Sequence, residues 1–243
     1  MLWDEEAAAT YDTPGEGMFA ASVVDPAVDR LAALAGDGAA LEFAVGTGRV
    51  GIPLAARGVP VTGIELSEAM AGRLREKEPS FRVEIGDMAA TRVDGEFTLV
   101  YLVFNTISNL LTQAEQVECF RNAARHLGPG GRFVVELFVP DLRGLPPGRD
   151  GSVHRAEDGY VLVHTYDVLN QGLVSHHFWF DGLRQARLFR SPHRYVWPAE
   201  LDLMAQLAGF ELESRHADWA GAPFTADSPA HVSTYRLPPA ATP

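Results

Sequence analysis

The hydrophobic pattern of the chain changes near residue 140, and the first part predicts an α/β architecture. Short apolar runs alternate there with stretches of helical spacing, the order expected for parallel strands linked by helices. The runs that predict strands lie at 41–45, 59–65, 81–85, 97–104 and 132–139. The run 97–104 is apolar almost throughout, as expected for a strand covered on both faces. We therefore expect a doubly wound sheet.

From residue 141 to residue 197 the hydrophobic period becomes two, which is typical of antiparallel strands. Segments with this alternation lie at 160–168, 173–180 and 187–197. Asn-Gln-Gly at 170–172 and Asp-Gly at 181–182 supply the turns between them. A helix at 198–208 and strands at 210–219 and 231–237 then follow. The pattern predicts a β-meander insertion between the fifth strand and the last helix.

Residues 1–38 are expected to form a helical segment that covers the sheet. Asp25 and Pro26 have the character of an N-cap and a first-turn proline. Val28, Leu31 and Leu34 follow at helical spacing. The sequence therefore predicts an amphipathic helix that starts at Asp25.

Composition limits the classes of function. The net charge of −12 argues against a nucleic-acid partner or an anionic membrane surface, because both need clustered Lys and Arg. The single cysteine, Cys119, excludes an intramolecular disulfide and a cysteine-cluster metal site, and we expect no metal. No basic leader and no run of about 18 apolar residues is visible, so we expect a cytoplasmic protein.

The first predicted strand ends in a glycine-rich turn. Residues 39–51 read AALEFAVGTGRVG, and a helical spacing follows up to Gly58. Gly46 and Gly48 suit a turn where a ligand approaches bare backbone, with the next helix directing its N-terminal amides at that ligand. The segment GTGRVG also matches the dinucleotide fingerprint G-x-G-x-x-G, which is a weak signal alone. Glu65 ends the second strand, where a carboxylate can accept both hydroxyls of a ribose.

Several segments together resemble the class I S-adenosylmethionine-dependent methyltransferases. Residues 42–48 resemble the first motif of that family, with Ala44 in place of its first glycine. An acidic turn, Gly-Asp-Met at 86–88, follows the third strand, and LGPGGRFVVE at 127–136 leads into the fifth. The run LVFNTISNL at 102–110 resembles the segment after the fourth strand in glycine and sugar-amine N-methyltransferases. The resemblance implies a seven-stranded Rossmann-like sheet, ordered 3-2-1-4-5-7-6, with a C-terminal antiparallel hairpin.

The resemblance implies S-adenosyl-L-methionine as cofactor and assigns residues to it. Tyr11 either closes over the cofactor or packs the N-terminal segment down. Glu65 would hold the ribose, Asp87 the adenine amino group, and the carbonyl of Val103 the methionine amino group. The residues expected to bind the cofactor are Tyr11, Glu42, Ala44, Gly46, Gly48, Glu65, Leu66, Met70, Asp87, Met88 and Val103.

The acceptor is expected between the end of the fourth strand and the insertion. Asn109 stands where the family has a histidine, so the resemblance does not secure a glycine or sugar-amine substrate. His176 and His177 are neighbours in one strand and must point to opposite faces, so at most one serves the pocket. His176 and Tyr166 are our candidates for catalysis. The residues expected to contact the acceptor are Phe104, Asn105, Thr106, Asn109, Glu136, His164 and Tyr195.

The expected function is methyl transfer to a nitrogen or oxygen of a small-molecule acceptor by a monomer or homodimer. A helical cap at 1–38, a cofactor-binding core at 39–140 and 198–237, and an insertion at 141–197 over the acceptor would carry it. One alternative is an NAD(P)-dependent oxidoreductase, although no Tyr-x-x-x-Lys pair for hydride transfer is visible. The other is a non-catalytic domain that binds S-adenosylmethionine.

Overall fold

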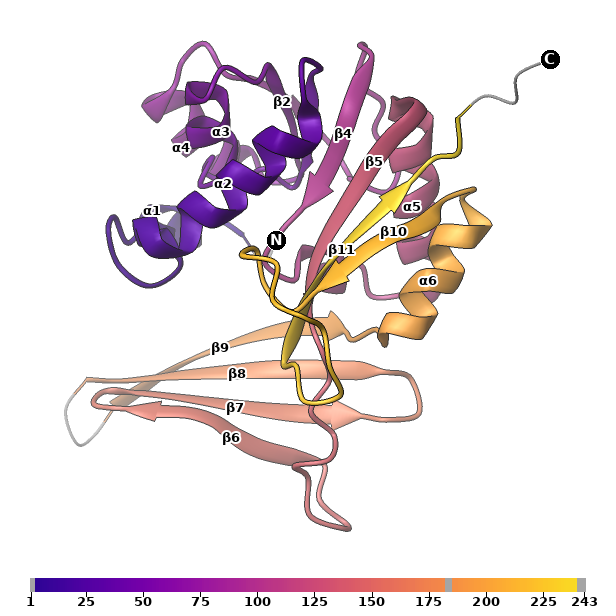
Figure 1. The fold of residues 1–243 in the computed structure, drawn as a ribbon. Helices are drawn as coiled ribbons and strands as arrows, with labels where there is room; N and C mark the ends of the chain where they lie inside the picture. The colour runs from indigo at the N-terminus through magenta and orange to yellow at the C-terminus, as the bar shows by residue number, and fades with distance from the viewer. Residues whose placement is uncertain (1–2, 182–184, 240–243) are drawn as a thin grey trace.

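A computed structural model describes residues 3–181 and 185–239, which form two sheets with helices around the larger one (Figure 1). The strands of the larger sheet are β1 (Ala40–Phe43), β2 (Val61–Glu65), β3 (Arg82–Ile85), β4 (Phe97–Leu102), β5 (Leu127–Phe138), β10 (Glu211–His216) and β11 (Ala230–Arg236). Their order is β3-β2-β1-β4-β5-β11-β10, and only the β10–β11 and β11–β5 pairs are antiparallel. The predicted strand order and C-terminal hairpin are confirmed.

The smaller sheet and the helices complete the fold. The smaller sheet contains β6 (Gly151–Glu157), β7 (Tyr160–Asp167), β8 (Gly172–Asp181) and β9 (Gln185–Arg194). The helices are α1 (Glu5–Tyr11), η1 (Gly17–Phe19), α2 (Ala21–Ala35), α3 (Gly51–Ala56), α4 (Glu68–Lys77), η2 (Thr106–Asn109), α5 (Gln113–His126) and α6 (Pro198–Leu207). Among the described residues, no helix combines the length and the apolar character needed to cross a membrane.

The seven-stranded sheet is buried on both faces by two separate apolar cores. Along β4, Val100 and Leu102 pack into the core beneath α5 and α6, whereas Leu99 and Tyr101 pack into the core beneath α2 and α3. All four side chains are fully buried. A strand covered on both faces needs apolar residues at consecutive positions, which explains the unbroken apolar run in the sequence.

Helix α2 begins earlier than Asp25, so the predicted N-cap at that residue is wrong. The carbonyl of Ala20 accepts hydrogen bonds from the amides of Val23 and Val24, and Pro26 lies inside the helix. Val24 is buried with Val28 on the same helical face. Burial of this additional turn offsets the backbone hydrogen bond that Pro26 cannot donate to the preceding turn.

The insertion forms a four-stranded antiparallel sheet, ordered β6-β7-β8-β9. It lies across the end of the larger sheet from which β5 continues into β6 (Figure 1). Strand β6 was not among the three predicted segments, because an irregular register between Val153 and Arg155 breaks its alternation. The turn predicted at 170–172 links β7 to β8, whereas residue 182 of the other predicted turn lies outside the described residues.

A buried arginine fixes the insertion to the core. Arg194, at the end of β9, is 6% exposed and donates hydrogen bonds to Gln116 on α5 (2.5 Å), Gln171 (2.8 Å) and Glu200 on α6 (2.7 Å). These bonds tie β9 to two helices of the larger layer. Strand β9 also packs against η2, which follows β4. The carboxyl end of β4 and the small sheet are therefore held side by side.

Candidate active site

The glycine turn after β1 contains a left-handed backbone at three of five residues. The φ angles are 52° at Ala44, 59° at Gly46 and 85° at Gly48. The φ at Gly48 favours glycine, and a Cβ there would also lie 2.7 Å from Ile52 Cδ1, so that side chain would have to move. Ala44 occupies a conformation that glycine adopts without strain, which explains why a glycine is usual at this position of the motif.

The carboxylate of Glu65 joins the end of β2 to this turn. It accepts hydrogen bonds from the backbone amides of Gly46 and Ser67, each at 2.8 Å. The side chain is 5% exposed, and burial raises the pKa of its carboxyl despite these two amide donors. The predicted proximity of Glu65 to the glycine turn is thus present in the structure.

Glu42 lies below the turn instead of facing open space. Its carboxyl accepts a 2.9 Å hydrogen bond from the hydroxyl of Tyr101, and burial raises its pKa to about 8. A Cβ on Gly51, the first residue of α3, would lie 2.6 Å from Glu42 Oε2. Glu42 therefore supports the start of α3 from within the protein.

Residues at the ends of β2 and β3 differ in what they offer a ligand. Leu66 is 54% exposed, whereas Met70 and Met88 are buried. Asp87 accepts a hydrogen bond from the amide of Ala89 through Oδ1 (2.8 Å). Leu66 is therefore open to solvent and Asp87 partly so, whereas the two methionines are closed off from it.

Tyr11 packs against other residues of the N-terminal segment. Its ring makes edge-on contacts with Trp3 (5.5 Å between centroids) and Phe19 (5.9 Å). Burial raises the pKa of its phenol, with smaller effects from the charges of Arg49 and Glu65. Both interpretations of Tyr11 thus have support. Its ring packs the N-terminal segment down, and its phenol is near the carboxylate of Glu65, which is expected to bind the ribose.

The segment after β4 has a second left-handed turn, with φ angles of 54° at Phe104 and 64° at Asn105. Glu136 on β5 holds it, since its Oε2 accepts from the amide of Phe104 (2.7 Å). The other oxygen, Oε1, accepts from the indole of Trp219 (2.8 Å). Glu136, which the sequence placed among the residues expected to contact the acceptor, thus holds a turn of the protein itself in this arrangement.

Most polar groups of the same segment are engaged with the protein itself. Asn105 Oδ1 accepts from the amide of Phe138 (2.7 Å), and Thr106 Oγ1 donates to the carbonyl of Val103 (2.7 Å). Asn109 is exposed at the end of η2. Phe104 is 46% exposed, and the guanidinium of Arg49 lies 5.1 Å from its ring centroid. Phe104 is therefore the residue of this segment that presents an open apolar surface beside the glycine turn.

Strand pairing divides the insertion into two faces. Directly paired residues share a face, so Leu162, His177 and Phe189 lie on one face, and Val163, His176 and Arg190 lie on the other. The first face also carries the buried residues Leu173, Ser175 and Ser191. Arg187 on this face forms an ion pair with Glu6 of α1 (2.8 Å). We call it the inner face, because it turns toward the N-terminal segment and the core.

The inner face carries a cluster of imidazole and phenol rings. His154 stacks on His164 with 4.3 Å between centroids, and Tyr166 contacts His164 edge-on. Tyr195 contacts Tyr166 in turn. Burial and neighbouring histidines lower the pKa of His164 to about 4, and burial similarly lowers that of His193 to about 4. No group of three His, Cys, Asp or Glu within the described ranges is arranged to hold a metal ion.

The structure does not bring the two candidates for catalysis together. Tyr166 belongs to the inner face, whereas His176 lies on the outer face. There, His176 Nε2 pairs with Thr165 Oγ1 (2.9 Å), and Arg190 Nε donates to Nδ1 (3.4 Å). Both ring nitrogens of His176 are engaged. His177, on the inner face, was the histidine left without a role, and alternation alone could not decide which face points inward.

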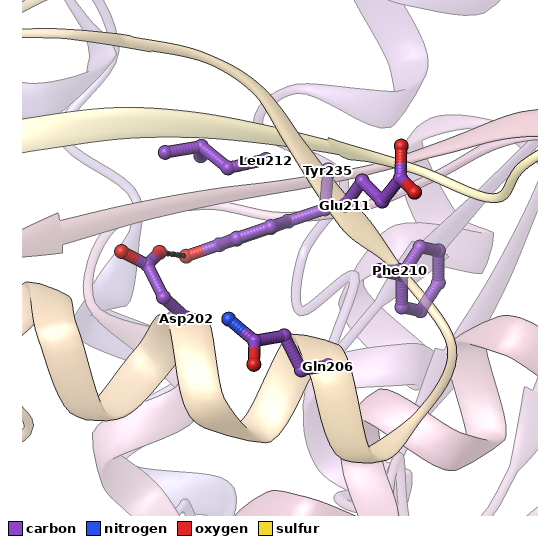
Figure 2. Close-up of a pocket in the computed structure, with 6 residues that line it drawn as sticks. All are labelled: Asp202, Gln206, Phe210, Glu211, Leu212 and Tyr235. Carbon is purple, nitrogen blue, oxygen red and sulfur yellow. Dashed lines mark hydrogen bonds between the residues drawn. The ribbon is translucent and has the colours of Figure 1, made fainter.

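A cavity of about 420 Å³ lies elsewhere, between α6 and β10 (Figure 2). Glu211 at its rim pairs with Arg236, which pairs with Arg132 in the first half of β5. The cavity is therefore at the opposite edge of the sheet from the glycine turn. Its residues are Asp202, Gln206, Phe210, Glu211, Leu212 and Tyr235.

Comparison with known proteins identifies relatives over the whole fold. A family model described as a methyltransferase domain matches residues 40–131. The chain is 40% identical to the CcbJ methyltransferase from Streptomyces caelestis, over 88% of each chain and with a TM-score of 0.80. It is 29% identical to the cypemycin N-terminal methyltransferase of a Streptomyces species, over 93% of this chain and 94% of that protein. CalS10, an amino pentose methyltransferase from Micromonospora echinaspora solved with S-adenosylmethionine, is 23% identical and has a TM-score of 0.70, over 97% of this chain and 98% of that one.

These relatives distinguish between NAD(P) and S-adenosylmethionine, since a glycine turn followed by a carboxylate is compatible with both. All three are methyltransferases, and the match to CcbJ covers most of both chains. The protein is thus an enzyme whose cofactor is S-adenosyl-L-methionine. The chain belongs to the class I S-adenosylmethionine-dependent methyltransferases.

Proposed function

We propose that this enzyme transfers the methyl group to an amine nitrogen of a small-molecule acceptor. The observation that supports it is the protonation chemistry of the inner face. His164 and His193 have pKa values near 4, and His177 Nδ1 lies 2.8 Å from the hydroxyl of Tyr160. An imidazole of such low pKa is a poor base near neutral pH, and a hydroxyl acceptor needs a positioned base far more than an amine does.

The relatives support the same atom. The cypemycin enzyme is named for methylation of an N-terminus, and CalS10 acts on an amino pentose. A neutral amine already carries the lone pair that attacks, so the protein has mainly to select the neutral form and align it.

The residues around the glycine turn fit the cofactor. Positive φ at Gly46 and Gly48 leaves the backbone bare where a ligand approaches, and the adjacent Glu65 carboxylate suits the two ribose hydroxyls. Asp87 accepts from the adenine amino group, with Leu66 on the ring face. Tyr11 presents an aromatic ring to the positive charge. Glu42, Ala44, Met70, Met88 and Val103 shape the floor and walls of this site.

The chemistry that S-adenosylmethionine supplies is a methyl group activated by its sulfonium. The protein holds the acceptor nitrogen in line with that methyl group, with Phe104 on one side and Tyr166 and His164 of the inner face on the other. Tyr195 is fully buried and contacts the ring of Tyr166, so it supports this face without reaching the acceptor. Exclusion of water by these rings favours the neutral amine, because burial disfavours the charged form. After transfer, the methylated ammonium releases its proton to solvent on departure.

We also propose which segments bind the cofactor and which cover the cofactor and the acceptor. Residues 39–140 and 198–237 bind the cofactor, residues 1–38 cover it, and the insertion at 141–197 covers the acceptor. The proposal is supported by the ties between these parts, since Arg187 of β9 pairs with Glu6 of α1 and Arg194 joins β9 to α5 and α6.

The test uses methyl-deuterated S-adenosylmethionine with a panel of matched acceptors. Each scaffold, a short peptide with a free N-terminus or an aminohexose, is offered beside its hydroxyl counterpart. Tandem mass spectrometry locates the label on nitrogen or oxygen, and Glu65→Ala serves as the control that lacks the ribose carboxylate. We expect label on nitrogen in the wild-type reaction only. Label on oxygen in the best acceptor would overturn the proposal.

A further inference from the structure

Polar contacts fasten the N-terminal segment to the cofactor side of the core. We call residues 3–20 the strap. The hydroxyl of Ser67, two residues after Glu65, donates to the carbonyl of Trp3 (2.5 Å). Arg49 Nη1 donates to the carbonyl of Met18 (3.1 Å). Between these ends, the carboxylate of Asp12 is the side chain of the strap that reaches the glycine turn.

Asp12 has two partners with different surroundings. Oδ1 accepts a 2.6 Å hydrogen bond from the hydroxyl of Thr47, and Oδ2 accepts a 2.7 Å bond from the ammonium of Lys77 on α4. Thr47 is 1% exposed and lies between Gly46 and Gly48. Without Asp12, the buried hydroxyl of Thr47 loses the partner that the structure gives it, which is costly in a site shielded from water.

The two hydrogen bonds of Asp12 are expected to stabilise the strap to different extents. The side chains of Lys77 and Asp12 are 38% and 28% exposed, and ion pairs at such positions contribute little because solvent screens them. The bond to Thr47 is short, charge-assisted and buried at the threonine end, which are the features of a strong hydrogen bond. The contact with the turn therefore outweighs the contact with α4.

This bond fixes two parts of the cofactor site at once. The amide of Gly46, next to Thr47, donates a hydrogen bond to Glu65. The position of the turn therefore sets the position of the carboxylate that is proposed to bind the ribose. The phenol of Tyr11, next to Asp12, is near enough to the same carboxylate for its charge to raise the pKa of the phenol. The hydrogen bond between Asp12 and Thr47 thus fixes the position of the strap relative to the glycine turn.

We propose that Asp12 is a positioning residue that latches the strap onto the glycine turn through the hydroxyl of Thr47 and so slows departure of the cofactor. It acts through Thr47 and Tyr11 and does not touch the reacting atoms. The inference concerns the cofactor alone, so it does not depend on whether nitrogen is the acceptor atom.

Binding of S-adenosylhomocysteine tests the latch without any acceptor. Calorimetry gives its Kd, and stopped-flow displacement gives the dissociation rate for Asp12→Ala, Thr47→Val and the double variant. Loss of a charge-assisted bond predicts a rise of about tenfold in Kd for either single variant, mostly in the dissociation rate. Because both changes remove one bond, the double variant should lose little more than either single one. Hydrogen exchange of residues 3–20 in the complex should rise in parallel.

Matched controls separate the latch from a general effect on folding. Thr47→Ser and Asp12→Asn each keep an atom that can make the bond and should retain binding within about threefold, well inside the tenfold expected for its loss. Lys77→Gln removes only the surface partner and should leave Kd within about twofold. Wild-type dissociation rates in folded Asp12→Ala, strictly additive losses, or an effect of Lys77→Gln equal to that of Asp12→Ala would each overturn the proposal.

Discussion

At the residue scale, the site depends on backbone conformations that most side chains avoid. Ala44 after β1, and Phe104 and Asn105 after β4, have φ angles between 52° and 64°. Both turns lie at the carboxyl ends of neighbouring parallel strands, the place where open α/β sheets bind ligands. The left-handed region costs an alanine about 1–2 kcal/mol. The fold carries this strain at the edge where the cofactor is proposed to bind.

Replacement of Ala44 by glycine should relieve the strain. Glycine adopts φ of 52° without a steric penalty, and the gain exceeds the entropy that glycine adds to the unfolded chain. We expect Ala44→Gly to raise the free energy of unfolding by about 0.5–1 kcal/mol in urea titrations. Ala55→Gly, in the exposed part of α3, is the matched control and should lower it by a similar amount. Equal losses in both variants would show that Ala44 is unstrained.

At the element scale, the turn after β4 is held by a carboxylate from β5. Glu136 accepts a hydrogen bond from the amide of Phe104 with one oxygen and from the indole of Trp219 with the other. A carboxylate suits this position because both of its partners are donors. This contact links β4, β5 and the loop between β10 and β11. It explains why a charged residue interrupts an apolar strand.

The variant Glu136→Gln should disturb this turn, because the amide nitrogen of glutamine would face the amide of Phe104 as a second donor. We expect the free energy of unfolding to fall by about 1–3 kcal/mol, with a shift in Trp219 fluorescence. Glu213→Gln removes a surface partner of Arg132 and should cost less than about 1 kcal/mol. A cost for Glu136→Gln no larger than that of this control would contradict the structural role.

The two faces of the insertion should respond differently to the loss of an imidazole. His164 lies on the inner face and His176 on the outer face, where Thr165 and Arg190 engage it. We expect His164→Phe to lower kcat/KM for the acceptor at least tenfold and His176→Phe to change it less than twofold, measured by product formation under saturating cofactor. Neither variant should alter the Kd for S-adenosylmethionine. The reverse order of effects would place the acceptor on the outer face.

Sequence patterns predicted the elements better than the faces and contacts between them. Strands, the glycine turn and the opposite orientations of His176 and His177 follow from local periodicity. The inward direction of the insertion depends on Arg194 and Arg187, whose partners are distant in the chain. Pro26 was misplaced because burial of Val24 extends the helix beyond its local start signal. The contact between Asp12 and Thr47 has no local signal at all.

At the scale of the whole molecule, buried titratable groups set how stability depends on pH. Burial lowers the pKa values of His164, His193 and His231 from 6.5 to about 4. Below pH 6.5 these imidazoles bind protons in the unfolded chain but stay neutral in the folded protein, so stability falls as pH falls toward 4. Burial raises the pKa of Glu42 from 4.5 to about 8. Between these two values the folded protein keeps a proton that the unfolded chain has lost, so stability falls as pH rises toward 8.

We therefore predict that the free energy of unfolding is largest near pH 6.5 and declines on both sides. Each group contributes at most about 1.4 kcal/mol per pH unit, and less for the half-buried His164 because solvent screens it. Urea titrations from pH 4 to pH 8.5 measure the profile. Glu42→Gln should flatten the decline above pH 6.5, whereas the exposed control Glu96→Gln should not. A profile that still rises from pH 6.5 to pH 8 in the wild type would contradict the buried proton on Glu42.

The most direct test of the account is a crystal structure of the enzyme with S-adenosylhomocysteine and an acceptor amine. We predict the ribose hydroxyls on Glu65, the adenine amino group beside Asp87, and the acceptor nitrogen between Phe104 and the inner face that carries His164 and Tyr166. The strap would lie closed, with Asp12 bonded to Thr47. An acceptor bound on the outer face beside His176, or a cofactor bound away from Glu65 and the glycine turn, would contradict it.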